Sequence, residues 1–67
     1  MKEKKSDNII PVSELVENGI YFSNNNELIK IKKIDNKNKE LYLYNITEHY
    51  NILFVKFENH NLTKRIR

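Results

Sequence analysis

Hydrophobic and polar positions alternate most clearly in two runs, 28–34 and 40–46, on either side of a polar, asparagine-rich connection at 35–39. The first run alternates isoleucine with lysine, and the second alternates leucine with tyrosine. Because successive side chains of a strand point to opposite faces, each run is typical of a half-buried strand. The two runs therefore predict a β-hairpin with its aliphatic side chains on one face and its lysines and tyrosines on the other.

The alternation of the first run is interrupted by two consecutive lysines, Lys32 and Lys33, which precede Ile34. A β-bulge at either lysine would return Ile34 to the apolar face and bend the strand. Small barrels are built from bent hairpins, so the interruption predicts a curved sheet.

Shorter apolar runs flank this hairpin and are separated from it by polar turns. The further strands that they predict are 20–23, 52–57 and 62–67. Over most of the run 52–57 both the odd and the even positions are apolar, as in a strand buried on two sides. We therefore expect Phe54, Val55 and Phe57 to belong to the least exposed strand. Short strands at roughly ten-residue spacing predict an antiparallel five-stranded meander closed into a small barrel.

The segment before the first predicted strand has two interpretations. Ser13 is placed to cap a short helical turn that ends with Gly19 in the left-handed conformation. Alternatively, Asn18 and Gly19 form the type I′ turn of a hairpin. We favour the helical turn, because Glu14 and Glu17 suit a helix N-terminus and no alternation precedes the turn. As the only glycine of the chain, Gly19 is expected at φ > 0.

These features together are similar to SH3-like or Tudor-like barrels. The similarity rests on an N-terminal turn, a glycine and strongly bent strands, and chiefly on the runs Ile31–Asp35 and Leu41–Tyr44. It extends from about Val12 to Ile66. The implied fold is all-β, a small five-stranded antiparallel SH3-like barrel with a short N-terminal helical turn and arm. No function follows from it, because unrelated functions share such folds.

The length of 67 residues predicts one small domain, with a net stability of ~3–5 kcal/mol. Residues 1–8 are polar and charged and predict a flexible basic arm, and residues 9–67 predict the domain. The chain has no cysteine and therefore no disulfide or thiolate metal site. It also lacks an apolar run of the ~20 residues needed to span a membrane, and residues 1–5 are followed by polar residues and not by the apolar segment expected of a signal peptide. We therefore expect a soluble, cytoplasmic protein without a membrane partner.

Residue usage is skewed toward asparagine, lysine, isoleucine and tyrosine, whose codons are AT-rich. This bias indicates a low-GC genome. The short length fits a phage or other mobile element, where the protein would lie in the particle or in the infected cell. Small ribosome-associated or regulatory proteins of low-GC bacteria have the same properties.

No group of residues in the sequence is arranged for catalysis or for holding a metal or cofactor. His49 and His60 lie in separate predicted turns, without helical i, i+4 spacing or a cysteine partner, and both are expected at the surface. No serine has the context of a nucleophile. A single glycine cannot form a P-loop or a dinucleotide-binding loop. We therefore expect a protein that is not an enzyme and takes no metal, cofactor or small-molecule substrate.

One candidate binding surface lies on the polar face of the central hairpin, joined by the last strand. Its residues are Lys30, Lys32, Tyr42, Tyr44, Arg65 and Arg67. Such residues form an ordinary strand surface, where tyrosine rings pack against lysine stems. They also suit a protein interface, in which tyrosine and arginine are enriched. A third interpretation is a single-strand-binding surface, where tyrosines stack on bases and cations contact phosphates.

The leading functional hypothesis is a small barrel that docks on a larger protein or macromolecular assembly as an accessory component or inhibitor. The alternative is a barrel that binds nucleic acid, as a single strand or as RNA. The net charge of +3 is lower than is typical of a dedicated nucleic-acid-binding domain, which favours the first hypothesis. The oligomeric state is left open.

Overall fold

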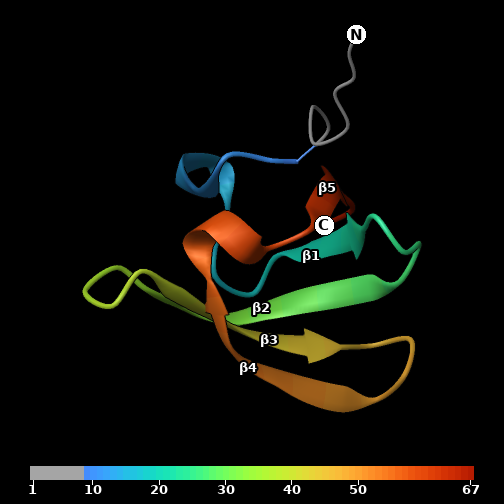
Figure 1. Cartoon of the computed structure of the whole chain (residues 1–67). Helices are drawn as coiled ribbons and strands as arrows, with labels where there is room; N and C mark the ends of the chain where they lie inside the picture. Colours follow the sequence, from blue (N-terminus) through green and yellow to red (C-terminus); the bar gives the residue numbers. More distant parts are fainter. Residues whose placement is uncertain (1–8) are drawn as a thin grey trace, which may run out of the picture.

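A computed structural model of the chain describes residues 9–67. The arm predicted for residues 1–8 lies outside the described residues. The described residues form five strands and two 3₁₀ turns and contain no α-helix (Figure 1). In chain order the elements are η2 (Val12–Glu14), β1 (Ile20–Ser23), β2 (Leu28–Asp35), β3 (Glu40–Asn45), β4 (Tyr50–Lys56), η3 (Phe57–Asn59) and β5 (Leu62–Arg65).

The strands form one antiparallel sheet in the order β4-β3-β2-β1-β5. The prediction of an all-β, five-stranded antiparallel fold is therefore confirmed. The predicted closure into a barrel is wrong, because β4 and β5 are the two edges of an open sheet. After β4 the chain passes through η3 to the far edge, where the four residues of β5 pair with β1.

The bulge predicted in the central hairpin is present at Lys32. Ile31 pairs with Leu43 and Lys33 pairs with Tyr42, so Lys32 has no partner of its own. The bulge returns Ile34 to the apolar face, where it is half-buried and packs against the core. The interruption in the hydrophobic pattern therefore located this irregularity correctly.

The core lies between the sheet and the two 3₁₀ turns, which are on the same side of it (Figure 1). The buried apolar side chains are Leu15, Tyr21, Ile29, Ile31, Leu41, Leu43 and Leu62. Val12 of η2 and Phe57 of η3 cover them and are themselves half-buried. One face of the sheet is thus packed, and the other face, which we call the outer face, points away from the turns.

The prediction that β4 is the least exposed strand is wrong. β4 is an edge strand in which only Ile52 and Val55 pack against the core. Leu53 and Phe54 are 55% and 59% exposed. They form a second bulge, because Leu43 pairs with Ile52 and Leu41 with Val55, which leaves both residues opposite Tyr42. The apolar run at both parities thus reflects a bulged edge strand, not a strand buried on two sides.

The segment before β1 forms a 3₁₀ turn over Val12–Glu14, shorter than the predicted turn and preceded by Pro11 at the N-cap position. The residue in the left-handed region is Asn18, with φ 70°, so the prediction of a positive φ for Gly19 is wrong. Glycine is required at position 19 for a different reason. A Cβ atom there would lie 2.8 Å from Cε1 of Tyr21, whose ring is fully buried.

Candidate binding surface

Cross-strand registers define which side chains share the outer face. Lys30 pairs with Tyr44 on one side and with Ile20 on the other, and Phe22 pairs with both Leu28 and Lys64. Partners directly opposite one another point to the same side of a sheet. The outer face therefore carries lysines beside aromatic and aliphatic side chains. Its principal members are Ile20, Phe22, Leu28, Lys30, Lys33, Tyr42, Tyr44, Phe54 and Lys64.

Four of the six predicted site residues come together on this face. Lys30 and Tyr44 are direct partners, and Tyr42 follows two residues earlier on the same strand. Although Lys32 is bulged, its Nζ donates a hydrogen bond to Oδ1 of Asn51 at 3.2 Å. Because Asn51 pairs with Tyr44, this hydrogen bond places the ammonium group of Lys32 on the outer face too.

The two predicted arginines do not join this group. Arg65 pairs with the buried Tyr21, on the side of the sheet that faces the core, and β1 and β2 separate it from β3. Its Nε donates a hydrogen bond to the carbonyl of Arg67 at 3.1 Å. A bulge in β5 turns Arg65 to the core side, because Ser23 pairs with Leu62 but Phe22 pairs with Lys64, which leaves Thr63 as an extra residue. As a result Lys64, and not an arginine, is the β5 cation on the outer face.

The most distinctive contact on the outer face joins Tyr42 and Phe54. Their ring centroids are 5.3 Å apart at an interplanar angle of 64°, an edge-to-face arrangement. Nζ of Lys33 lies 5.9 Å from the centroid of Tyr42, within reach of a cation–π interaction. We call Lys33, Tyr42 and Phe54 the aromatic cluster. Sequence reasoning missed Lys33 and Phe54, because the side of the sheet to which each one points depends on which residue of its bulge is unpaired.

Phe54 is in an unusual backbone conformation. Its φ is 62°, in the left-handed region that costs a residue with a side chain about 1–2 kcal/mol. Yet Phe54 is 59% exposed, so it recovers little of this cost by burial in the described fold. The bulge instead turns the ring onto the outer face beside Tyr42.

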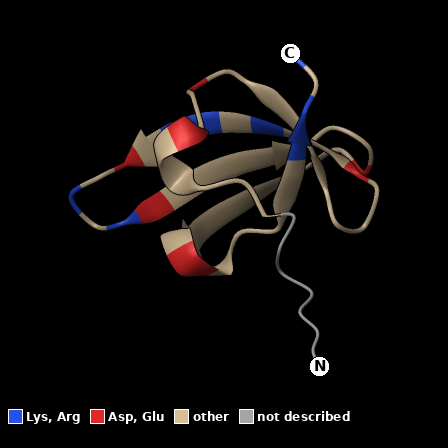
Figure 2. Ribbon diagram, turned by 90° about the horizontal axis from the view of Figure 1, so that it is seen from above, with Lys and Arg blue, Asp and Glu red and all other residues tan. Residues whose placement is uncertain are grey.

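Charge is distributed unevenly around the molecule. The one ion pair within residues 9–67 joins Nζ of Lys56 to Oε2 of Glu40 at 3.4 Å. Lys30, Lys33 and Lys64 therefore have no acidic partner in that part of the chain. On the opposite side of the sheet both 3₁₀ turns carry a glutamate, and Figure 2 shows each turn with a red segment. The outer face is consequently the basic side of the sheet.

The two histidines have different surroundings. His49 is exposed, as predicted, with its Nδ1 3.4 Å from the hydroxyl of Tyr44. The surface prediction for His60 is wrong, because His60 is buried and its Nδ1 accepts a hydrogen bond from the backbone N–H of Leu62 at 3.1 Å. Burial lowers the pKa of His60, although a hydrogen bond to the backbone of Ile10 acts in the opposite direction. His60 thus ties the segment before η2 to β5.

Within residues 9–67, no cluster of three or more histidine, aspartate or glutamate side chains is suited to hold a metal ion. The same residues include no helix with the length and apolar character needed to cross a membrane. Comparisons with known proteins found no matching family model, no matching curated protein and no matching solved structure.

Proposed function

We propose that the protein is a non-enzymatic, SH3-like domain that docks on a larger protein or assembly, as an accessory component or inhibitor. We place it in a phage or other mobile element of a low-GC host, acting in the cytoplasm of that host. The SH3-like description is supported by the antiparallel meander, by the bend at the Lys32 bulge and by the short β5, which returns beside β1.

The observation that carries the proposal is the exposed pair Leu53 and Phe54 in an edge strand. Natural edge strands are usually protected by charge or by a covering segment, and large exposed apolar side chains that lie together mark interaction sites. The backbone strain at Phe54 adds weight, because strained residues are concentrated at functional sites. Burial of the Phe54 ring in a partner would supply the favourable free energy that the isolated fold does not provide.

The aromatic cluster has the composition of an interface anchor. A partner that covered Tyr42 and Phe54 would bury two aromatic rings, the side chains that most often contribute the largest share of binding energy. Lys33 beside them, with Lys30 and Lys64 farther along the same face, would meet acidic groups at the rim. Charged rims direct the approach and orientation of a partner more than they raise its affinity.

Binding to single-stranded nucleic acid is the second candidate. It is supported by the proximity of Tyr42 and Tyr44 to lysines that have no ion pair within residues 9–67. The tyrosines would stack on bases while the lysines contact phosphates. Phosphate contacts would make the affinity fall steeply between about 50 and 200 mM salt, whereas an apolar docking surface would be nearly insensitive to salt. Salt dependence therefore separates the two candidates.

The test begins with capture of partners from a lysate of the native host by the wild-type protein and by Phe54→Asn. Asparagine tolerates the left-handed conformation and replaces the ring with a small amide. Tyr50→Thr is the matched control, because Tyr50 is an exposed aromatic residue of the same strand whose register partner, Asn45, is buried on the core side. A protein captured by the wild type and by Tyr50→Thr but not by Phe54→Asn supports the proposal. Equal capture by all three proteins contradicts it.

A further inference from the structure

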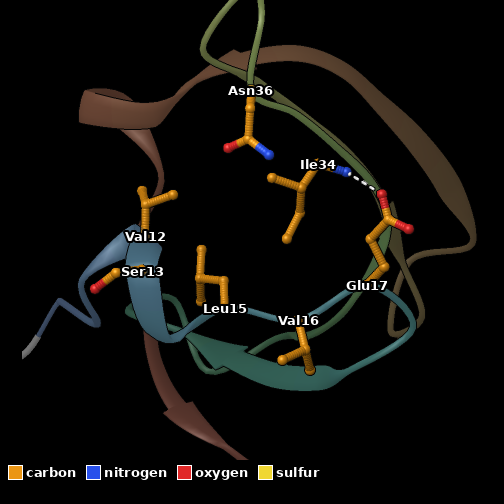
Figure 3. A pocket seen from close by; sticks show the side chains of 7 residues that line it. All are labelled: Val12, Ser13, Leu15, Val16, Glu17, Ile34 and Asn36. Carbon is orange, nitrogen blue, oxygen red and sulfur yellow. Dashed lines mark hydrogen bonds between the residues drawn. The ribbon is translucent and has the colours of Figure 1, made fainter.

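A groove opens on the core side of the sheet, where the segment around η2 faces the end of β2 and the β2–β3 loop (Figure 3). Its volume is about 470 Å³, within the range of protein pockets that bind ligands. The residues that line it are Val12, Ser13, Leu15, Val16, Glu17, Ile34 and Asn36. None of them belongs to the outer face, so the groove is a separate site from the proposed docking surface.

The floor of the groove is aliphatic. Leu15 is 5% exposed, and Val12 and Ile34 are half-buried and pack against the core. In Figure 3 these three side chains point toward the same space from the η2 segment on one side and from β2 on the other. Such a floor suits an aliphatic side chain of a binding partner.

The rim of the groove carries a carboxylate that is held in place. Oε2 of Glu17 accepts a hydrogen bond from the backbone N–H of Ile34 at 2.9 Å, so the side chain bridges the η2 segment and β2. Within the described residues its other oxygen has no hydrogen bond and no cation within ion-pair distance. The carboxylate therefore presents a fixed negative charge beside an apolar floor, in a chain whose net charge is positive.

A polar side chain on another part of the rim is also available. Asp35 holds the β2–β3 loop, because its Oδ1 accepts the backbone N–H groups of Lys37 and Asn38 at 3.1 Å. Asn36 takes no part in these bonds, and its amide extends over the groove in Figure 3. An amide can both donate to and accept from the backbone of an extended polypeptide.

We infer that the groove binds a polypeptide segment in which an aliphatic side chain lies next to a lysine or arginine. The aliphatic side chain enters the floor formed by Val12, Leu15 and Ile34, and the cation pairs with the Glu17 oxygen that accepts no hydrogen bond within residues 9–67. Charge complementarity selects this occupant over a neutral or acidic segment. The inference does not depend on the outer face, so the chain has two binding surfaces on opposite sides of one sheet.

The inference is tested by titrating the ¹⁵N-labelled protein with three probes that share an N-acetyl-leucine and differ in the charge of the second residue. The probes are N-acetyl-leucyl-arginine amide, N-acetyl-leucyl-glutamine amide and N-acetyl-leucyl-glutamate amide. We expect shifts of the amide signals of Leu15, Glu17, Ile34 and Asn36. The arginine probe should bind about threefold more tightly than the glutamine probe, as an exposed ion pair allows, and the glutamate probe should bind most weakly.

Protein variants then assign the charge preference. Glu17→Gln keeps an oxygen that accepts the N–H of Ile34 and should abolish the difference between the arginine and glutamine probes. Glu14→Gln is the matched control, because Glu14 lies in η2, is exposed and does not line the groove. It should leave that difference unchanged. Asn36→Trp changes an exposed loop residue and should block all three probes.

Three results would overturn the inference. The first is the absence of shifts at the groove with every probe, and the second is a set of shifts confined to the outer face. The third is a preference for arginine that persists in Glu17→Gln. Because these measurements use only the purified protein and the probes, they can fail while the outer face still binds its partner, and the reverse also holds.

Discussion

β3 and β4 are neighbouring strands, both rich in aliphatic and aromatic residues, yet they are buried very differently. In β3 the residues alternate strictly, so that Leu41 and Leu43 are buried while Tyr42 and Tyr44 are half-buried on the outer face. In β4 the bulge at Leu53 and Phe54 leaves large apolar side chains exposed. The comparison shows that the periodicity of an apolar run, and not its hydrophobicity, determines how much of it is buried.

The largest expected effect separates the two strands directly. Leu41→Ala removes a fully buried side chain between β2 and β4 and should lower the free energy of unfolding by about 2–5 kcal/mol. Leu53→Ala removes the same atoms from an exposed position and should change it by less than about 0.5 kcal/mol. Urea denaturation followed by tyrosine fluorescence measures both values. Equal losses in the two variants would mean that β4 is as buried as β3.

A smaller effect is expected where packing, not backbone conformation, requires a glycine. Gly19→Ala places a methyl group 2.8 Å from the buried ring of Tyr21 and should destabilise the protein by about 1–3 kcal/mol. Asn18→Gly is the control, because Asn18 is already left-handed and exposed, and this change should cost less than about 0.5 kcal/mol. Thermal unfolding of the two variants measures the difference. A tolerated alanine would show that the Tyr21 ring can move.

We expect the stability of the fold to depend on pH through His60, which lies two residues before the start of β5. Burial lowers the pKa of His60 below its ordinary value of 6.5, so in the interval between the folded and unfolded pKa values the unfolded chain binds the proton more readily. The stability supplied by neutral His60 is fully present above pH 6.5 and is lost as the pH falls below it. In the wild type, unfolding midpoints measured from above pH 6.5 to below it should decrease as the pH falls.

Two variants assign this decline to one histidine. His60→Asn should flatten the pH dependence below 6.5, even though the substitution itself destabilises the fold. His49→Asn changes the exposed histidine and should leave the dependence as it is in the wild type. A wild-type profile that is flat in this interval would contradict the account of His60.

The smallest expected effect concerns the lysines of the outer face. Lys30→Gln combined with Lys33→Gln should change stability by less than about 0.5 kcal/mol per site, because neither lysine is in an ion pair within the described residues. If the partner is nucleic acid, the same pair of changes should make the slope of log affinity against log salt shallower, by an amount that corresponds to roughly two phosphate contacts. If the partner is a protein with an apolar contact, the salt dependence should stay small. Titrations at two salt concentrations provide this comparison.

Much of the fold follows from the sequence, and the exceptions have physical causes. Alternation predicted the central hairpin, since register is fixed wherever one face is buried, and the interruption of the alternation at Lys32 and Lys33 predicted its bulge. Alternation could not predict that β4 is an edge strand, because the run 52–57 has no regularly spaced polar residues that would show which side is exposed. Nor could it predict the buried Asn45, which donates to Oε1 of Glu27 and accepts from the N–H of Glu48. Such bonds depend on how two turns meet in space.

The candidate surface was predictable to the same degree. Lys30, Tyr42 and Tyr44 lie where alternation places them, on one face of the hairpin. Lys64 takes the place on the outer face that was predicted for Arg65, because a bulge in the short edge strand β5 reverses which residues face each side of the sheet. No residue in the sequence marks this bulge. Phe54 was assigned to the core for a similar reason. Bulges therefore account for the errors at both edges of the sheet.

The most direct test of the central claim compares the stability and the partner affinity of one variant. For Phe54→Asn the account predicts an unfolding free energy within about 1 kcal/mol of the wild type, because relief of backbone strain offsets the lost contact with Tyr42. Calorimetry with the partner isolated from the host should show an affinity loss of about 2 kcal/mol or more. A loss of stability of ~3–5 kcal/mol with unchanged affinity would contradict it, because that is the behaviour of a core phenylalanine.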